Sequence, residues 1–276
     1  MNHLLCLGYS YTAQYLAKLL NRDEWQISGT SRSTTGVAQM REQGVAGYIF
    51  DELNHLPSEV THVLVSIPPD VQGCPAAHKF GSTYPWTAYL STTGVYGNQN
   101  GGWVDEDTPL TPQSDRARKR VIAEQQWQKF NAHVFRLPGI YGPGRSQLDA
   151  VADGTARRVI KQGQIFSRIH VEDIAGILAA SMLNPSPGRI YNVADDEPCP
   201  PQDVVAYAAQ LLGVAAPPVI AFEEANLSPM ARSFYDESKR VSNLRIKSEL
   251  GIKLLYPNYR VGLQSILDRQ PMRSET

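Results

Sequence analysis

Short apolar segments alternate with segments of helical pattern through the first half of the chain, and this alternation constrains the fold more than any other feature. The segments run in the order HLLCLG, TAQYLAKLLNR, WQISGTSR, GVAQMREQG, GYIF, THVLVSI and WTAYLST. Strands that alternate with helices are typical of a parallel sheet with helices packed on its faces. The sequence therefore predicts an α/β fold with a doubly wound parallel sheet.

The same pattern continues past the middle of the chain and then changes. A strand HVFRLPGIYG, a strand IFSRIHV, a helix EDIAGILAASM and a strand RIYNVAD follow in order. The last 80 or so residues combine an amphipathic helix, PQDVVAYAAQLLG, with a polar, proline-interrupted segment and a closing helix, YRVGLQSIL. We predict a nucleotide-binding domain from residues 1–143 with 163–194, and a smaller C-terminal substrate-binding lobe from residues 144–162 with 195–276.

The turn after the first predicted strand resembles a dinucleotide-binding fingerprint. In LLCLGYSYTAQYLA, Gly8, Ser10 and Ala13 occupy the three positions of G-x-G-x-x-G/A, between a strand and a helix. Such a turn directs the N–H groups of the helix N-terminus at a pyrophosphate. Ser10 departs from the pattern, and a strand-to-helix turn without a ligand is the alternative. Tyr11 is the next residue expected to contact the cofactor.

The end of the second predicted strand favours NADP over NAD. Arg32 lies nineteen residues after Ala13, where NAD-binding folds usually carry an acid for the ribose 2′-hydroxyl. A guanidinium there suits a 2′-phosphate, and Ser31 and Ser33 add hydroxyl donors. The alternative is an arginine that is merely exposed. Asp51, after the third strand, is a candidate contact on the adenine side.

Composition excludes several classes of protein. The 276 residues carry 26 lysines and arginines against 27 aspartates and glutamates, a formal charge of −1, so a nucleic-acid partner is not expected. No run of about 18 apolar residues indicates a membrane span. The start, MNHLLCLGYS, lacks the features of a secretory signal, so a cytoplasmic location is expected. The three cysteines are far apart and suggest neither a disulfide framework nor a metal site.

A cluster of basic residues lies in SDRARKRVIAEQQW, residues 114–127. We predict a helix over 114–131, with Ser114 as its N-cap. Two opposite-charge pairs at (i, i+4) spacing, Asp115 with Lys119 and Arg120 with Glu124, are expected on its surface. Most of this charge is compatible with an ordinary solvated face.

Taken together, the motifs resemble the extended short-chain dehydrogenases/reductases, the NAD(P)-dependent epimerase/dehydratase family, and within it the atypical members. Besides the Gly8 turn, the resemblance rests on SIPPD (66–70), LSTTGVYG (90–97), FRLPGIYGPGR (135–145), SRIHVEDIA (167–175) and RIYNVADDEP (189–198). It covers nearly the whole chain. It implies a Rossmann-type sheet, with cofactor contacts from Ser66, Pro68 and Pro138, and a C-terminal lobe over the substrate.

The resemblance also places the catalytic positions and shows a departure. Typical members use a tyrosine and a lysine four residues later, with a Ser/Thr hydroxyl that Thr92 matches here. Counting back from Glu124, a glutamate of the family pattern, places Arg116 and Arg120 at the tyrosine and lysine positions. A guanidinium does not exchange a proton near neutral pH, so the usual mechanism is broken. A register one residue earlier would pair Asp115 with Lys119.

Other residues are candidates to replace the lost tyrosine. Tyr96, Tyr141 and His170 lie in the family motifs, although each also fits a structural role. Arg116, Arg120 and Arg145 are suited to clamp a phosphate or carboxylate. The segment ARSFYDESKRVSN is a candidate wall for an anionic or sugar-like substrate, and a solvated loop is the alternative; its polar residues are Arg232, Ser233, Tyr235, Lys239, Arg240 and Asn243.

Two functions remain open at this point. The first is an NADP-binding oxidoreductase or epimerase/dehydratase-like protein that acts on a small polar substrate, such as a nucleotide sugar. The second is a catalytically silent NADP-binding redox sensor or interaction protein. Glycines and prolines in GCPAAHKFGSTYP predict a stunted helix where family dimers usually form, so a monomer or a weak, non-standard dimer is expected.

Overall fold

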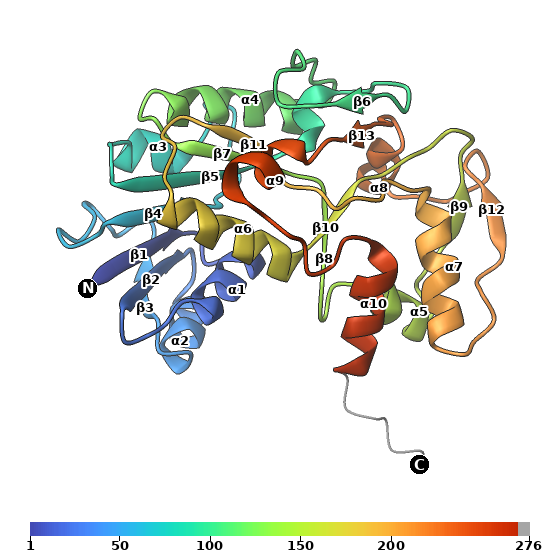
Figure 1. Ribbon diagram of the computed structural model, residues 1–276, viewed down its shortest axis with the longest axis horizontal. Coiled ribbons are helices and arrows are strands. Elements are labelled where there is room, and N and C mark those ends of the chain that lie inside the picture. The colour runs from blue at the N-terminus through green and yellow to red at the C-terminus, as the bar shows by residue number, and fades with distance from the viewer. Residues whose placement is uncertain (270–276) are drawn as a thin grey trace.

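A seven-stranded parallel sheet forms the centre of the molecule (Figure 1), in a computed structural model that describes residues 1–269. The strand order is β11-β7-β5-β4-β1-β2-β3. The strands are β1 (Asn2–Leu7), β2 (Trp25–Ser31), β3 (Ala46–Ile49), β4 (His62–Val65), β5 (Trp86–Thr92), β7 (His133–Leu137) and β11 (Ile190–Asn192). The predicted doubly wound α/β fold is confirmed.

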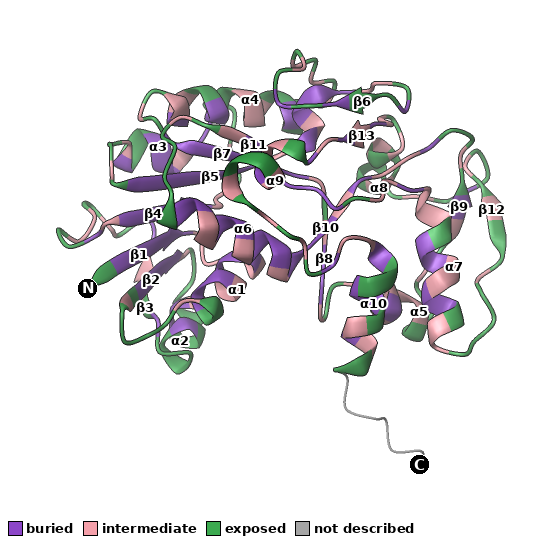
Figure 2. Ribbon diagram, in the orientation of Figure 1, coloured by how far each residue is buried: buried purple, intermediate pink, exposed green. Residues whose placement is uncertain are grey.

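Alternation along the strands explains why both faces carry helices. Leu4 and Cys6 of β1 pack into one hydrophobic core, whereas Leu5 and Leu7 pack into another on the opposite face. The first core is covered by α1 (Tyr11–Leu19), α2 (Thr34–Glu42), α6 (Val171–Leu183) and α9 (Leu244–Leu250). The second is covered by α3 (Pro75–Phe80) and α4 (Asp115–Gln128). Figure 2 shows this buried centre.

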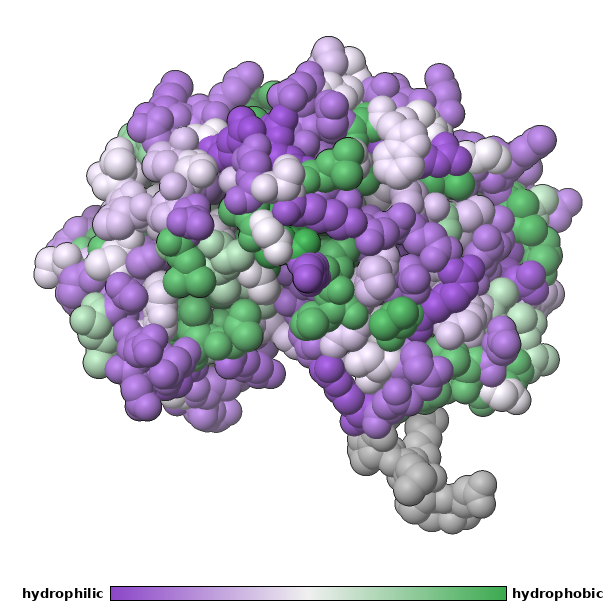
Figure 3. Space-filling view, in the orientation of Figure 1, coloured by the Kyte–Doolittle hydropathy of each residue, from purple (hydrophilic) through white to green (hydrophobic). Residues whose placement is uncertain are grey.

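A smaller lobe lies beside the sheet, opposite α1 and α2 in Figure 1. It consists of α5 (Gln147–Ala152), β9 (Arg158–Ile160), α7 (Pro201–Leu211), β12 (Val219–Ala221), α8 (Pro229–Phe234) and α10 (Tyr259–Asp268). Its own core joins α5, α7 and α10 through Leu148, Val204 and Leu263. Figure 3 shows that the outline of the molecule is indented between this lobe and α1.

Part of the predicted C-terminal unit returns to the part of the chain that is built around the sheet. The strand β13 (Arg240–Val241) pairs with β6 (Trp103–Val104), and Ile246 of α9 is fully buried in the core beside α6. The predicted boundary, which assigns all of 195–276 to the lobe, does not allow for this return. The predicted strand HVFRLPGIYG likewise divides at Pro138 into β7 and β8 (Gly139–Tyr141), and β8 pairs with β10 (Arg168–His170).

The basic helix begins where the sequence predicts, but its ion pairs differ. Ser114 caps α4 by accepting from the N–H of Ala117. Asp115 pairs with Arg118 rather than Lys119, at 2.5 Å. Glu124 is buried and pairs with Arg136 of β7 at 2.8 Å, so the predicted pair with Arg120 was wrong. A partner on a neighbouring strand displaces the local pair because both groups of the buried pair need full hydrogen bonding.

Three smaller observations complete the fold. The helix α3 has only six residues, as the glycines and prolines around it predict. All three cysteines are buried thiols without a disulfide in the described part of the chain. Within residues 1–269 no helix is long and apolar enough to cross a membrane.

Candidate cofactor and substrate site

The turn after β1 has a geometry that requires glycine. Gly8 has a φ of +88°, and a Cβ there would approach the Ser66 Oγ to 3.0 Å. The Ser66 hydroxyl donates to the Gly8 carbonyl at 2.6 Å, and the Gly8 N–H donates to Thr30 Oγ1 at 2.8 Å. Ser10 is the N-cap of α1, and its side chain accepts from the Ala13 N–H. The departure from the glycine pattern is therefore a helix cap, which leaves the Ser10 O–H able to donate.

A cavity of about 850 Å³ opens at the carboxyl ends of β1 to β4 and is called the β1 cavity here. It is lined by most of the residues that the sequence predicts for the cofactor, namely Gly8, Ser10, Ser31, Arg32, Ser33, Asp51, Ser66 and Pro68. Tyr11 and Ala13 lie in the first turn of α1 outside this lining, and the Tyr11 hydroxyl donates to the Pro143 carbonyl at 3.0 Å.

The N-terminus of α2 strengthens the case for an anion beside Arg32. Ser33 caps α2 by accepting from the Gly36 N–H at 3.2 Å, and Ser31 Oγ accepts from the Ser33 N–H at 3.2 Å. Thr35 and Gly36 also line the β1 cavity. Sequence reasoning missed these two residues, although the helix that follows Arg32 was the available signal, because a helix N-terminus attracts negative charge.

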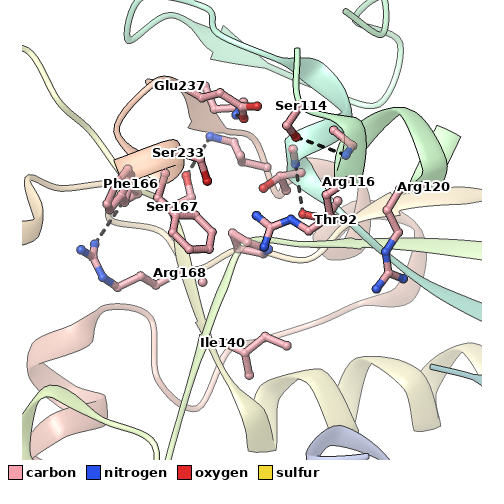
Figure 4. A pocket seen from close by; sticks show the side chains of 18 of the residues that line it. Thr92, Ser114, Arg116, Arg120, Ile140, Phe166, Ser167, Arg168, Ser233 and Glu237 are labelled. Carbon is pink, nitrogen blue, oxygen red and sulfur yellow. Dashed lines mark hydrogen bonds and ion pairs between the residues drawn. The ribbon is translucent and has the colours of Figure 1, made fainter. Parts of the chain in front are cut away.

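A second cavity, of about 380 Å³, lies at the carboxyl ends of β5 and β7 and is called the β5 cavity here (Figure 4). It receives Thr92 from β5, Arg116 and Arg120 from α4, Pro138 after β7 and Arg145 after β8. Thr92 caps the short 3₁₀ helix Thr93–Tyr96 by accepting from the Gly94 N–H at 3.1 Å. Both cavities thus open at the same edge of one parallel sheet, where ligands of such folds bind.

The two arginines of α4 play different parts in this cavity. Arg120 donates to the Leu90 carbonyl at 2.6 Å and to the Tyr89 hydroxyl at 3.1 Å, so its guanidinium is tied to β5. The guanidinium carbon of Arg116 lies 4.8 Å from the centre of the Phe234 ring in α8. Figure 4 shows Arg116 pointing into the cavity and Arg120 pointing away from its centre.

The structure does not bring Tyr96 or Tyr141 to either cavity lining. The Tyr96 hydroxyl donates to Asn192 Oδ1 at 2.7 Å and accepts from Arg136 at 2.8 Å, and burial raises its pKa to about 12. The Tyr141 hydroxyl donates to the Asn258 carbonyl at 3.4 Å, and burial raises its pKa further. Both hydroxyls are thus engaged by neighbouring residues outside the two cavity linings, which fits a structural role.

His170 is likewise a structural residue. It is the N-cap of α6, and its Nδ1 accepts from the Glu172 N–H at 3.3 Å. Burial lowers its pKa to about 4, which keeps the imidazole neutral at physiological pH.

The polar segment of the C-terminal region contributes directly to the β5 cavity. Ser233, Glu237 and Lys239 line it, and the Lys239 Nζ lies 2.6 Å from a Glu237 carboxylate oxygen. This pair is largely withdrawn from solvent, with side chains 10% and 15% exposed. The other polar residues of the predicted wall, Arg232, Tyr235, Arg240 and Asn243, do not line the cavity.

Ser167 and Arg168, two further lining residues, were not predicted as site residues. Ser167 Oγ accepts from the Val241 N–H at 3.1 Å, and Arg168 donates to the Phe166 carbonyl at 3.1 Å. Their position within the motif SRIHVEDIA was the available signal.

Sequence comparison finds relatives of low identity. No protein-family model matches the chain. Protein YeeZ of Escherichia coli K12 is 26% identical over 94% of this chain and 97% of YeeZ. A 3-diazoavenalumate denitrifying reductase from a Streptomyces species is 28% identical over 181 residues, which are 58% of each protein.

Comparison with solved structures identifies the fold. A functionally unknown conserved protein from Silicibacter pomeroyi is 51% identical, with a TM-score of 0.91 over 97% of this chain and 99% of that one. Human epimerase family protein SDR39U1, solved with NADPH, is 17% identical, with a TM-score of 0.79 over 98% and 100%. The dTDP-glucose 4,6-dehydratase of Bacillus anthracis, solved with NAD, is 15% identical, with a TM-score of 0.72 over 97% and 96%.

The chain has the extended short-chain dehydrogenase/reductase fold. This is the fold that the resemblance to the epimerase/dehydratase family implies. The Silicibacter protein shares this fold and half of the sequence, so the two chains belong to one family of that fold.

Proposed function

We propose that the chain is an NADP-dependent oxidoreductase that reduces a small polar substrate in the β5 cavity. The observation that carries the proposal is the order of features along one sheet edge. The glycine turn and Arg32 lie at the β1 cavity, and Thr92 lies at the β5 cavity. A dinucleotide in this fold spans the same edge, so its two ends would reach both cavities.

The residues of the β1 cavity fit the cofactor. The Cβ-free surface of Gly8 and the capped N-terminus of α1 would hold the pyrophosphate. Arg32, with the N-terminus of α2, would hold a 2′-phosphate. The nicotinamide end would lie near Thr92 and Pro138, and when bound the cofactor supplies the hydride.

The proton donor is the part of the mechanism that the arginine substitutions leave open, and we assign it to Lys239. Reduction of a polarised double bond consumes one proton together with the hydride. Guanidinium groups hold their protons at neutral pH, whereas an ammonium can release one to a developing oxyanion and recover it from solvent. Glu237 fixes the Lys239 Nζ through its ion pair at the wall of the cavity.

Relatives support the assignment to reduction. The Streptomyces protein is named as a reductase, and the human protein is solved with NADPH. The alternative, a silent NADP-binding sensor, is favoured by the motif register, which assigns Arg116 to the position of the family's tyrosine.

The test combines binding and turnover. Calorimetry is expected to show tighter binding of NADPH than NADH, and a panel of aldehydes, ketones and unsaturated acids is expected to include one that oxidises NADPH. Tight NADPH binding with no oxidation by any compound would favour the sensor. Equal affinities for the two cofactors would remove the assignment to NADP.

The assignment of the proton donor has its own test. Lys239→Met is expected to keep NADPH binding and to lose about 10²–10⁴-fold in turnover. Lys239→Arg keeps the positive charge without a transferable proton, so it is expected to remain equally slow. Recovery of turnover in Lys239→Arg would show that only the charge matters, and Lys239 would then be a positioning residue.

A further inference from the structure

The β5 cavity is unbalanced in charge. The basic residues in its lining are Arg116, Arg120, Arg145, Arg168 and Lys239, and its acidic lining residue is Glu237. A site with this excess of fixed cations attracts an anion. The identity of that anion depends on which of the cations have partners already.

Three of the five cations are engaged by the protein. Arg120 donates to a β5 carbonyl, and Lys239 pairs with Glu237. Arg168 donates to the Phe166 carbonyl and lies 3.0 Å from the Cys199 Sγ. These side chains keep their positions without a ligand.

Arg116 and Arg145 differ from these three. Neither guanidinium has a hydrogen-bond or acidic partner within residues 1–269, and both residues are exposed at the cavity. The nearest aromatic rings position them instead: Phe234 for Arg116, and Tyr11, whose ring centre lies 5.9 Å from the guanidinium carbon of Arg145. Stacking on an aromatic ring leaves the N–H edge of a guanidinium open to a carboxylate.

The rest of the lining combines the hydroxyl groups of Thr92, Thr93, Ser114, Ser167 and Ser233 with an apolar surface. Ile140, Ile165, Phe166, Phe234 and Val241 contribute this surface. A ligand that fills such a cavity presents an apolar body to these side chains and its charge to the two arginines. The cavity of about 380 Å³ would have to hold both the nicotinamide end of the cofactor and the substrate, so the substrate is expected to be small.

We infer that the substrate is a small carboxylic acid with an apolar body, and that Arg116 and Arg145 bind its carboxylate. This inference rests on the proposed function, because it names the substrate class of the same cavity. It also gives the substitution of the family tyrosine a chemical purpose: Arg116 exchanges a proton carrier for a carboxylate ligand that is planar and makes two parallel hydrogen bonds.

The test uses three probes on the intact protein: 4-hydroxycinnamate, its methyl ester and phenyl phosphate. Calorimetry in the presence of saturating NADPH is expected to show 4-hydroxycinnamate binding at least about tenfold tighter than the ester. Equal affinity for the acid and the ester would overturn the inference. Tighter binding of phenyl phosphate than of the acid would overturn the choice of a carboxylate.

Variants connect the binding to the two arginines. Arg116→Gln and Arg145→Gln are each expected to weaken binding of the acid about tenfold and to leave the ester unchanged. Arg118→Gln is the matched control, because Arg118 lies on the same helix, pairs with Asp115 and does not line the cavity. Unchanged affinity in both cavity variants would overturn the inference.

Failure of the two proposals can be distinguished. If NADPH does not bind, the proposed function fails, and the probes are then measured on the protein alone. If NADPH binds but the acid has no preference over the ester, only the substrate class is wrong. Thermal unfolding of each variant without ligand identifies any change that comes from misfolding.

Discussion

The two ends of the sheet are built from the same strands but have opposite chemistry. At the amino ends, the buried side chains of His62, Trp86 and His133 form a row with the half-buried Trp25, and successive ring centres from Trp25 to His133 are separated by 4.6, 6.0 and 6.1 Å. Burial lowers the pKa of His62 to about 4 and that of His133 below its usual value, so both imidazoles are neutral near pH 7. This end is closed and packed.

The carboxyl ends are open and charged. Gly8 follows β1 and Thr92 ends β5, both without a large side chain, and Arg32 and Arg116 line the two cavities there. Close packing of side chains, as at the amino ends, stabilises the folded protein. Hydrogen-bond donors without a protein partner, as at the carboxyl ends, are available to bind ligands. From this comparison we expect the amino ends to stabilise the sheet and the carboxyl ends to bind ligands. It predicts that substitutions at one end change unfolding, and that substitutions at the other change affinity.

The largest expected effect is at the amino end. Trp86 is 1% exposed, and its indole N–H donates to Ser181 at 3.1 Å. Trp86→Ala is expected to reduce the free energy of unfolding by about 3–5 kcal/mol, because it leaves a cavity between two histidines. Urea denaturation measures this loss. Arg116→Ala is the control from the other end and is expected to stay within about 0.5 kcal/mol of the native protein. A larger effect of Arg116→Ala would break the comparison.

The next effect concerns cofactor choice at the carboxyl end. Arg32→Asp is expected to remove about 1.5–3 kcal/mol of NADPH binding, or about ten- to a hundredfold, because a charge-assisted bond is replaced by repulsion. The unfolding free energy of the unliganded variant is expected to stay unchanged, since Arg32 is exposed. Calorimetry with NADPH and NADH measures the preference. If NADPH affinity were unaltered, the 2′-phosphate would bind elsewhere.

A pH titration sharpens the comparison from the amino end. In the unfolded chain His62 gains a proton near pH 6.5, but in the folded protein it does so only near pH 4. Stability from this residue is therefore complete above pH 6.5 and falls as the pH is lowered toward 4, by at most about 1.4 kcal/mol per pH unit.

The buried acids Asp173 and Asp195 act in the opposite direction, because burial raises their pKa values to about 6 and about 8. As the pH rises toward those values, these two acids ionise in the unfolded chain before they do so in the folded protein, so they lower the free energy of unfolding progressively. The difference in unfolding free energy between the native protein and His62→Phe isolates the histidine. It is expected to shift in favour of His62→Phe as the pH falls from 6.5 to 4. A difference independent of pH would show that His62 is solvated.

The smallest effect separates the two arginines of α4. Arg120→Lys loses the paired hydrogen bonds to Leu90 and Tyr89 and is expected to cost about 1 kcal/mol of unfolding free energy. It is expected to leave binding of 4-hydroxycinnamate unchanged. Thermal unfolding and calorimetry measure the two quantities. Weaker binding of the acid would assign Arg120 to the ligand rather than to the strand.

The sequence predicts the parts of this protein that are specified locally. The alternation of segments predicts the sheet, and the Ser10 and Ser114 caps depend on residues within a few positions of one another. The residues of the β1 cavity follow from the ends of adjacent strands, because parallel strands end at one edge. This is why most of the predicted cofactor residues line one cavity.

The parts that depend on distant contacts could not be predicted in the same way. The charge pattern of α4 is compatible with either face, so it does not separate Arg116 from Arg120. Glu124 takes a partner from β7 because the helix packs there, which local spacing does not reveal. The Lys239–Glu237 pair lies in a segment whose sequence shows only that it is polar. Its place in the β5 cavity depends on the pairing of the next strand, β13, with the distant strand β6.

That return has a mechanical consequence. After β8 the chain enters the smaller lobe, comes back at β10, leaves again after β11, returns at β13 and leaves once more between α9 and α10. A lobe joined by a single connection can rotate about it as a hinge, but here all of the connections would have to bend at the same time. Movement between the two parts is therefore expected as a small slide of packed helices, of the shear kind. In that case the width of the opening to the β5 cavity is set by the side chains that line it rather than by movement of the lobe.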